Sequence, residues 1–188
     1  MRVVLASKSP RRKELLGRII KDFDIMTREV DETLPAGVHP SVGVEMLSIR
    51  KGEALLPMVD EDTMVISSDT LVELDGVALG KPRDREDAHK MLRSLSARVH
   101  NVHTGVAVHY RGKCYSGTQT SHVKFREMSD EEIYSYIDTG EPMDKAGSYG
   151  IQGLGGKFVV EFDGEFEGIM GLSVVLTQRL VDAALLGE

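Results

Sequence analysis

The segment from Ser7 to Arg12 is the first part of the chain that could bind a phosphate. It reads SKSPRR and follows a short apolar run at 3–6. Ser9 is suited to cap a helix that begins at Pro10, and the free N–H groups of a helix N-terminus favour an anion. Two arginines in the first helical turn oppose the helix dipole, which argues against a purely structural role. A solvated basic turn with an ordinary helix cap explains the pattern equally well.

Carboxylates and isolated lysines are the next candidates. Asp69 follows the apolar run at 64–66, and open α/β sheets place their ligand crevices at the carboxyl ends of strands. A carboxylate that caps a turn is an equally good interpretation of Asp69. Lys51 and Lys81 are lone cations, each a surface lysine unless the fold gathers them. Asp31-Glu32 is either a solvated acidic patch or a pair of metal ligands, and spacing does not decide between them.

Two segments look like known motifs but lack their chemistry. GVALGK at 76–81 has one residue too few between its glycines for a phosphate-binding P-loop, and Pro82 replaces the Ser or Thr that would hold magnesium. His100 and His103 are spaced as H-x-x-H, but on a predicted strand their side chains point to opposite faces. We therefore expect surface or sheet histidines rather than metal ligands.

Alternating strands and helices would position these residues. Apolar runs predict strands at 3–6, 23–26, 64–66, 71–74, 77–79 and 158–160, and two long strands at 99–109 and 114–125 that turn at Arg111-Gly112. Helical spacing predicts helices over 11–20 and 172–186, and others that begin near Ser41, Asp84 and Ser129. Asp75-Gly76 is typical of a two-residue hairpin turn, whereas 140–156 is glycine-rich and irregular. The alternation indicates an α/β fold.

Composition narrows the class of protein. The 188 residues are expected to form one domain, 1–188, because 41% hydrophobic and 28% charged residues are ordinary for a globular chain. A balance of 23 Lys and Arg against 30 Asp and Glu gives a net charge of −7, which argues against binding a nucleic acid polymer. A single cysteine excludes an internal disulfide, and no apolar run is long enough for a signal peptide or a membrane span. These features predict a cytoplasmic enzyme.

Several longer motifs occur in a characteristic order. They are LASKSPRRKELL at 5–16, Asp31-Glu32, Lys51, SDTLV at 68–72, GKP at 80–82, LRSLSARVHNVHTG at 92–105, TGEPMDKAGSYGIQG at 139–153 and GLS at 171–173. In these motifs the chain resembles the Maf family of nucleoside triphosphate pyrophosphatases over nearly its whole length. It departs from the family pattern at Ser67-Ser68, usually Gly-Ala, and at Gly52, usually alanine. Ala97 and Ser173 replace a usual glycine and proline.

The resemblance implies a fold and a reaction. The fold would be inosine-triphosphatase-like, an elongated mixed β-sheet flanked by helices with a substrate cleft between two lobes. The reaction would be hydrolysis of a nucleoside triphosphate to the monophosphate and pyrophosphate with a divalent metal, Mg²⁺ or Mn²⁺, in a homodimer. Arg12, Thr70 and Gln152 match the branch that acts on dTTP and UTP, which is thought to remove unwanted or modified pyrimidine nucleotides.

The resemblance also assigns roles that suit the chemistry of the side chains. Asp69 is the expected catalytic residue, either as a general base toward water or as a holder of the metal. Glu32 and Asp69 are the candidate metal ligands, since magnesium uses few protein carboxylates. The residues expected to bind the phosphates are Ser7, Arg12, Lys51 and Lys81. Such a cluster is needed because a triphosphate brings about four negative charges to an acidic protein.

A second class of function is a nucleotide-binding regulator that restrains septum formation through a partner and turns over slowly. The family has been linked to arrest of cell division, but the sequence has no partner groove or exposed apolar helix that would favour this class. A turnover assay with dTTP, UTP, GTP and ATP plus magnesium discriminates the two classes.

Overall fold

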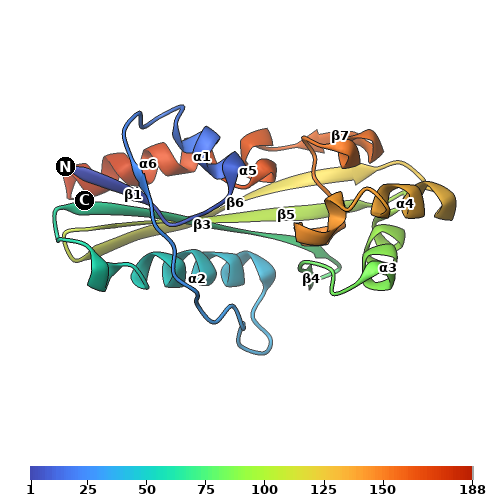
Figure 1. Cartoon of the computed structure of the whole chain (residues 1–188), viewed down its shortest axis with the longest axis horizontal. Coiled ribbons are helices and arrows are strands. Elements are labelled where there is room, and N and C mark those ends of the chain that lie inside the picture. The colour runs from blue at the N-terminus through green and yellow to red at the C-terminus, as the bar shows by residue number, and fades with distance from the viewer. Residues whose placement is uncertain (188) are drawn as a thin grey trace.

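A long, mixed β-sheet runs through the molecule (Figure 1), and the computed structural model describes residues 1–187 of it. The seven strands lie in the order β2-β1-β3-β5-β6-β7, and β4 pairs with β3. β1 is parallel to β2 and β3, whereas all other pairs are antiparallel. The strands are β1 (Arg2–Leu5), β2 (Asp24–Ile25), β3 (Thr63–Leu74), β4 (Val77–Leu79), β5 (Val99–Tyr110), β6 (Lys113–Phe125) and β7 (Val159–Asp163).

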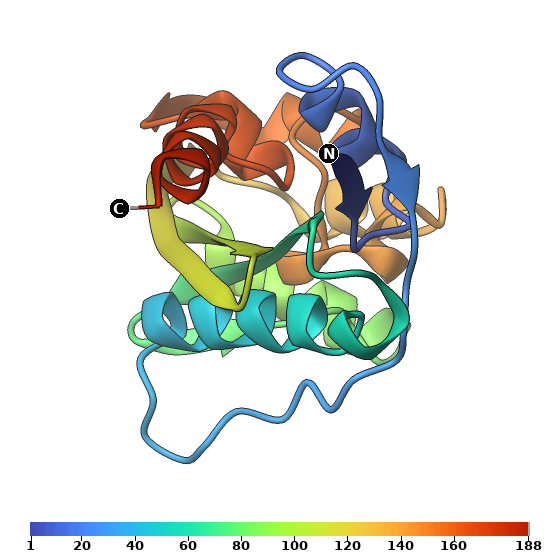
Figure 2. The ribbon, with the colours of Figure 1, turned by 90° about the vertical axis from the view of Figure 1, so that its left-hand side faces the viewer.

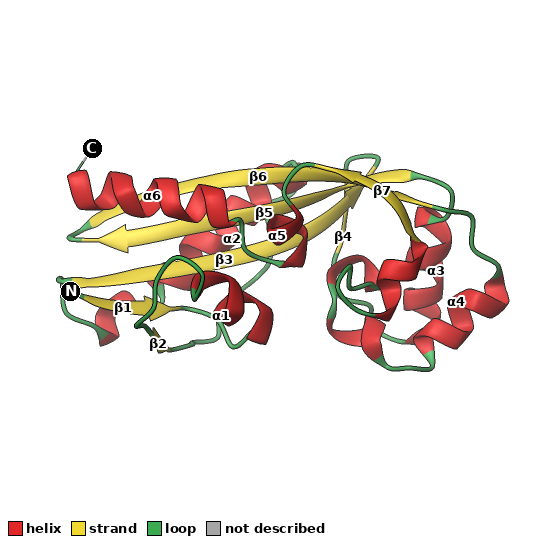
Figure 3. Ribbon diagram, turned by 90° about the horizontal axis from the view of Figure 1, so that it is seen from above, coloured by secondary structure: helices red, strands yellow, loops and turns green. Residues whose placement is uncertain are grey.

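Helices cover both faces of the sheet. The α-helices are α1 (Pro10–Leu16), α2 (Pro40–Glu53), α3 (Arg85–Leu95), α4 (Asp130–Ile137), α5 (Phe166–Met170) and α6 (Val174–Leu186). Short 3₁₀ turns occupy Leu56–Met58, Glu141–Asp144, Ala146–Ser148 and Leu154–Phe158. An end-on view places α2 on one face and α1 and α6 on the other (Figure 2). From above, α3 and α4 form a separate group at the far end of the sheet (Figure 3). Over residues 1–187 no helix combines the length and apolar character that crossing a membrane requires.

Local signals set the ends of several elements as the sequence predicts. Ser9 caps α1, its hydroxyl accepting the Arg12 N–H at 3.4 Å. Ser129 and Glu132 form the expected capping box of α4. Asp75 and Gly76 have φ of 53° and 80°, the left-handed pair that a two-residue hairpin of this type requires. The alternating elements, the elongated mixed sheet and the flanking helices expected from the sequence are therefore confirmed.

Three details of the prediction are wrong. The strand predicted at 64–66 does not end within the polar residues 67–70: it joins the extended segment predicted at 71–74 as one strand, β3, because β5 pairs with it after β1 has stopped at the level of Ile66. The helix predicted over 11–20 ends at Leu16, where Gly17 caps it; the isoleucines beyond still pack against the core. The helix predicted from 172 begins at Val174, and the short helix α5 before it is not predicted, since five residues are too few for a periodic pattern.

Two apolar clusters fill the two ends of the molecule. The first packs α1 and α6 on the sheet and includes Leu5, Leu15, Ile66, Val106, Leu172 and Leu180. The second packs α3 and α4 and includes Val72, Leu92, Val102, Phe125, Ile133 and Phe158. β3 and β5 contribute to both clusters, so each lobe is built on the same continuous strands. The space between the two clusters is where a polar site can form.

The two histidines of the H-x-x-H segment are buried sheet residues. His100 packs edge-on against Phe125 and bonds to the Tyr149 hydroxyl at 2.8 Å. His103 lies 3.3 Å from the Glu73 carboxylate. Burial lowers the pKa of His100 to about 4, so that ring is neutral at physiological pH. The prediction that they do not form a metal pair is consistent with these separate partners.

Candidate active site

A cleft of about 940 Å³ opens between the two lobes. Every site residue predicted from the sequence lines it: Ser7, Arg12, Glu32, Lys51, Asp69, Thr70, Lys81 and Gln152. They come from β1–α1, from the loop before α2, from α2 itself, from β3, and from two loops of the opposite lobe. Residues that are remote in the sequence thus face one space.

The staggered ends of two parallel strands create the polar floor of the cleft. β1 pairs with β3 only as far as Leu5 opposite Ile66, and the chain then leaves the sheet toward α1. β3 continues, so Asp69 and Thr70 lie just beyond the carboxyl end of β1, at an edge where α/β sheets bind ligands. Ser67 fixes the opposite side, because its hydroxyl donates to the Ser48 carbonyl of α2 at 2.6 Å.

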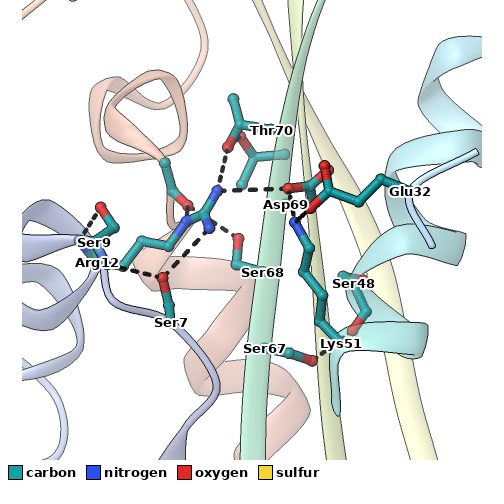
Figure 4. A network of polar contacts seen from close by, with 12 residues as sticks. Ser7, Ser9, Arg12, Glu32, Ser48, Lys51, Ser67, Ser68, Asp69 and Thr70 are labelled. Carbon is teal, nitrogen blue, oxygen red and sulfur yellow. Dashed lines mark hydrogen bonds and ion pairs between the residues drawn. The ribbon is translucent and has the colours of Figure 1, made fainter. Parts of the chain in front are cut away.

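Lys51 joins two carboxylates in this floor (Figure 4). Its Nζ lies 2.6 Å from Asp69 Oδ1 and 2.9 Å from Glu32 Oε1. The side chains of Lys51 and Asp69 are 17% and 12% exposed, whereas that of Glu32 is 59% exposed. The hydrogen bond from Lys51 lowers the pKa of Glu32 against the opposing effect of burial, so Glu32 is a carboxylate at neutral pH.

Arg50 places Glu32 from the other side. One terminal guanidinium nitrogen of Arg50 donates to the carbonyls of Asp31 and Thr33, at 3.1 and 2.7 Å, so it holds the backbone on both sides of Glu32. Two consecutive residues of α2 therefore position Glu32: Arg50 bonds to the backbone beside it, and Lys51 contacts its carboxylate. No signal in the sequence points to Arg50, because its partners are backbone atoms of an irregular loop.

Arg12 is fixed by four contacts (Figure 4). Its Nε donates to the Gly171 carbonyl at 2.8 Å, and its terminal nitrogens lie 3.3 Å from Thr70 Oγ1 and 3.5 Å from Ser7 Oγ. A terminal nitrogen is also 3.9 Å from Asp69 Oδ1. Burial lowers the pKa of Arg12, and the Asp69 charge opposes this shift. A guanidinium remains protonated in proteins, so Arg12 is a pre-positioned cation beside the carboxylate.

The opposite wall carries Lys81 and Gln152. Both side chains are exposed, and within residues 1–187 Lys81 has neither a hydrogen bond nor an ion pair to its ammonium. Its charge helps to lower the pKa of Glu32, after the larger effects of Lys51 and of burial. Sequence reasoning missed other charged residues of this wall, including Glu141 and Lys145. They lie in the glycine-rich segment, where no periodicity marks them.

Two carboxylates of the cleft can hold a divalent cation. Among the described residues, no three His, Cys, Asp or Glu side chains gather as a ready metal site. Glu32 and Asp69 nevertheless converge on the same ammonium, so their oxygens face one point. Magnesium is bound through one or two protein carboxylates together with substrate phosphates and waters. The pair fits that ligand set.

The unusual glycine beside Lys51 has a packing cause. A Cβ on Gly52 would lie 2.4 Å from His109 Nδ1 and 2.9 Å from Ser67 Oγ. His109 is 4% exposed, and burial lowers its pKa, so a neutral ring occupies the space that an alanine methyl would need. Gly52 and Ser67, two positions where the chain departs from the family pattern, are therefore neighbours where α2 packs on β3.

This packing gives a stability prediction. Gly52→Ala is expected to lower the free energy of unfolding by about 1–3 kcal/mol, the cost of overpacking a filled interior. In a His109→Ala background the same change is expected to destabilise less, because only the contact with Ser67 Oγ remains and alanine favours helix more than glycine does. Urea denaturation of the four proteins measures both effects, and an identical change in the two backgrounds would refute the packing argument.

A family model and curated relatives match nearly the whole chain. The family described as Maf-like protein matches residues 2–184. A dTTP/UTP pyrophosphatase of Bdellovibrio bacteriovorus is 42% identical over 185 residues, covering 95% of this chain and 96% of the relative. That of Thermococcus onnurineus is 46% identical over 178 residues, covering 95% of each. A solved dITP/XTP pyrophosphatase of Mycobacterium abscessus aligns with a TM-score of 0.47 at 13% identity, covering 99% of this chain and 97% of that one. The extent of the family match and the identity to these relatives show that the chain belongs to the Maf family.

Proposed function

We propose that this protein hydrolyses nucleoside triphosphates, preferentially dTTP and UTP, to the monophosphate and pyrophosphate. The observation that carries the proposal is a carboxylate, Asp69, held 2.6 Å from Lys51 in a cleft that also presents Arg12 and Lys81. The relatives from Bdellovibrio bacteriovorus and Thermococcus onnurineus are named dTTP/UTP pyrophosphatases, which supports the same substrates. The cluster of cations around one carboxylate suits a nucleoside triphosphate: the cations bind the negatively charged phosphates, and the carboxylate can activate the attacking water.

Asp69 is proposed to accept the proton of an attacking water. Lys51 occupies Oδ1, and among residues 1–187 no donor contacts Oδ2, which leaves that oxygen to orient a water. The water oxygen forms a bond to the α-phosphorus, the bond from this phosphorus to the α–β bridging oxygen breaks, and pyrophosphate leaves with the electron pair. The proton passes to Asp69, and Arg12 stabilises the charge that develops on the phosphoryl oxygens.

Glu32 and Asp69 are proposed to hold a divalent cation. When bound, such a cation neutralises phosphate charge and polarises the phosphoryl oxygen. Lys51 orients both carboxylates toward one point, because it contacts both.

Turnover of dTTP, UTP, CTP, GTP and ATP with Mg²⁺ tests the proposal. Pyrophosphate and the monophosphate are the expected products, and hydrolysis in ¹⁸O-labelled water is expected to place the label in the monophosphate. Label in pyrophosphate, or orthophosphate as the product, would contradict attack at the α-phosphorus. Failure to turn over any nucleotide would leave the regulator that restrains septum formation as the better function.

Gln152 is proposed to recognise the pyrimidine base. Uracil and thymine present an N–H between two carbonyls, and a glutamine amide offers the complementary acceptor and donor. Cytosine presents an amino group and a bare ring nitrogen at the same edge. A site built on such hydrogen bonds discriminates strongly, because the wrong edge leaves buried polar groups unpaired. Thr70, whose hydroxyl lies 3.3 Å from Arg12, would place base recognition beside the chemistry.

Gln152→Ala is therefore expected to lower the UTP/CTP ratio of kcat/KM by about tenfold, the value of roughly one net hydrogen bond. Pyrophosphate should remain the product. Gln178→Ala, on the exposed surface of α6 outside the cleft, is the matched control. A UTP/CTP ratio equal to that of the unmodified protein would remove Gln152 from base recognition.

The family resemblance further leads us to propose a single catalytic domain, a homodimer and a cytoplasmic location. Sedimentation of the purified protein measures the oligomeric state, and a monomer at micromolar concentration would contradict the dimer.

A further inference from the structure

The residues around Gln152 form a tight turn that leads into the 3₁₀ turn Leu154–Phe158. Gly153 N–H donates to the Gly150 carbonyl at 3.2 Å, which closes the turn. We call residues 150–155 the base-recognition turn, since Gln152 lies near its tip and lines the cleft. Three of these six residues are glycines, which lose more conformational freedom on ordering than other residues. Such a segment needs external contacts to present a side chain in one direction.

Two side chains from outside the turn supply these contacts. Tyr136 Oη accepts the Gly150 N–H at 3.3 Å. Glu141 accepts the Leu154 N–H at 2.9 Å through Oε2 and the Gly155 N–H at 3.1 Å through Oε1. The two side chains are linked, since Tyr136 Oη donates to Glu141 Oε1 at 2.8 Å. They therefore hold both ends of the base-recognition turn and leave its tip toward the cleft.

Two glycines of the turn lie so close to Glu141 and Tyr136 that neither position has room for a side chain. A Cβ on Gly153 would lie 2.6 Å from both carboxylate oxygens of Glu141. A Cβ on Gly155 would lie 2.5 Å from the hydroxyl of Tyr136. No side chain fits between the turn and its two supports, so close approach of the backbone is built into the sequence.

The electrostatics make the contacts strong. Burial raises the pKa of Tyr136, and Glu141 adds to the shift, so the phenol keeps its proton as a donor. Burial also acts to raise the pKa of Glu141, but the N–H groups and the phenol that donate to it outweigh burial and lower this pKa. The carboxylate is thus charged, and hydrogen bonds to a charged acceptor are roughly twice as strong as neutral ones.

We propose that Tyr136 and Glu141 are positioning residues for base selectivity: they hold the base-recognition turn so that Gln152 presents its amide in one orientation. This rests on the proposed recognition of the base by Gln152. Ordering the turn before the nucleotide arrives removes an entropic cost from binding. The ordered turn also prevents the Gln152 amide from rotating to pair with cytosine. Tyr136 and Glu141 therefore affect base selectivity without forming a bond to the base.

Glu141→Gln and Tyr136→Phe test the proposal, since both keep the shape of the side chain. Each is expected to lower the UTP/CTP ratio of kcat/KM by about fivefold, since a small misplacement of a recognition group has a large kinetic effect. The change should come from a higher KM for UTP, with kcat within about twofold because Asp69 and Lys51 belong to other elements. Tyr134→Phe, on the same helix α4 as Tyr136, and Glu131→Gln, an exposed carboxylate of α4, are the controls, since within residues 1–187 neither side chain has a hydrogen bond to the turn.

Hydrogen exchange gives a readout independent of activity. In Glu141→Gln the Leu154 and Gly155 amides are expected to exchange at least about tenfold faster, because opening a local contact exposes them. Amides of β5 should be unchanged, which also shows that the variant is folded. Unchanged protection at Leu154 and Gly155 would overturn the proposal.

A double variant separates this proposal from the function of Gln152. With Gln152→Ala in place, Glu141→Gln should cause no further fall in the UTP/CTP ratio, because it acts through Gln152. Equal falls in both backgrounds, or an unchanged ratio in folded Glu141→Gln while Gln152→Ala lowers it, would overturn the positioning role. If Gln152→Ala itself leaves the ratio unchanged, the proposed base recognition fails, whatever Glu141→Gln does to amide exchange.

Discussion

Replacement of Asp69 by asparagine is expected to lower kcat for UTP by at least about 100-fold, the usual contribution of a positioned acid–base group. The change is nearly isosteric, and the amide oxygen can still accept the bond that Lys51 makes to Oδ1 at 2.6 Å. The amide cannot take up the proton of water, and it is a poorer ligand for a divalent cation. The measurement is kcat at saturating UTP and Mg²⁺, together with the urea midpoint of unfolding.

Asp163→Asn is the matched control, because Asp163 is an exposed carboxylate of β7 outside the cleft. It should leave both kcat and the urea midpoint unchanged. If Asp69→Asn keeps more than a tenth of the unmodified turnover, the catalytic assignment of Asp69 is wrong. A large fall in the urea midpoint would instead indicate that the loss of charge beside Lys51 and Arg12 disturbs the fold.

The sequence predicts best the features that depend on neighbouring residues. The cap at Ser9, the capping box at Ser129 and the hairpin at Asp75 are each specified within about four residues, and all three form as expected. Long strands are predicted as pieces: the polar residues at 67–70 interrupt the apolar pattern of β3, but the backbone continues because β5 pairs along it. A pattern of side chains does not report such pairing.

The meeting of the site residues depends on tertiary packing. Lys51 and Asp69 come together only because α2 packs on β3, where Ser67 bonds to the α2 backbone. From spacing alone Lys51 is an ordinary surface lysine, and Asp69 is equally well a ligand-site carboxylate or the cap of a turn; the family resemblance supplied their grouping. Glu141 lies in the motif at 139–153, but the sequence indicates no role for it or for Tyr136, since their partners are backbone amides of a segment without periodicity.

Lys81→Ala is expected to lower kcat/KM for UTP by about 10–150-fold, since one charge-assisted phosphate contact is worth about 1.5–3 kcal/mol. Among the cations of the cleft, Lys81 is the one whose replacement is easiest to interpret. It has no bond to protein atoms in the described part of the chain, whereas Arg12 supports Gly171, Thr70 and Ser7. The effect of Lys81→Ala therefore measures the contact with the nucleotide, because the contacts among the other site residues stay in place. Lys90→Ala, an exposed lysine of α3 outside the cleft, is the control.

The comparison of substrate with product decides where on the nucleotide Lys81 acts. UMP carries fewer charges than UTP and lacks the β- and γ-phosphates, so its inhibition constant should rise by less than about threefold, well under one charge-assisted contact. Lys81 stands on the lobe opposite Asp69, as expected of a group that holds the departing end of the triphosphate while attack occurs at the α-phosphorus. An equal loss of affinity for UMP and UTP would place Lys81 at the α-phosphate or the sugar and would require the nucleotide to lie in the opposite direction along the cleft.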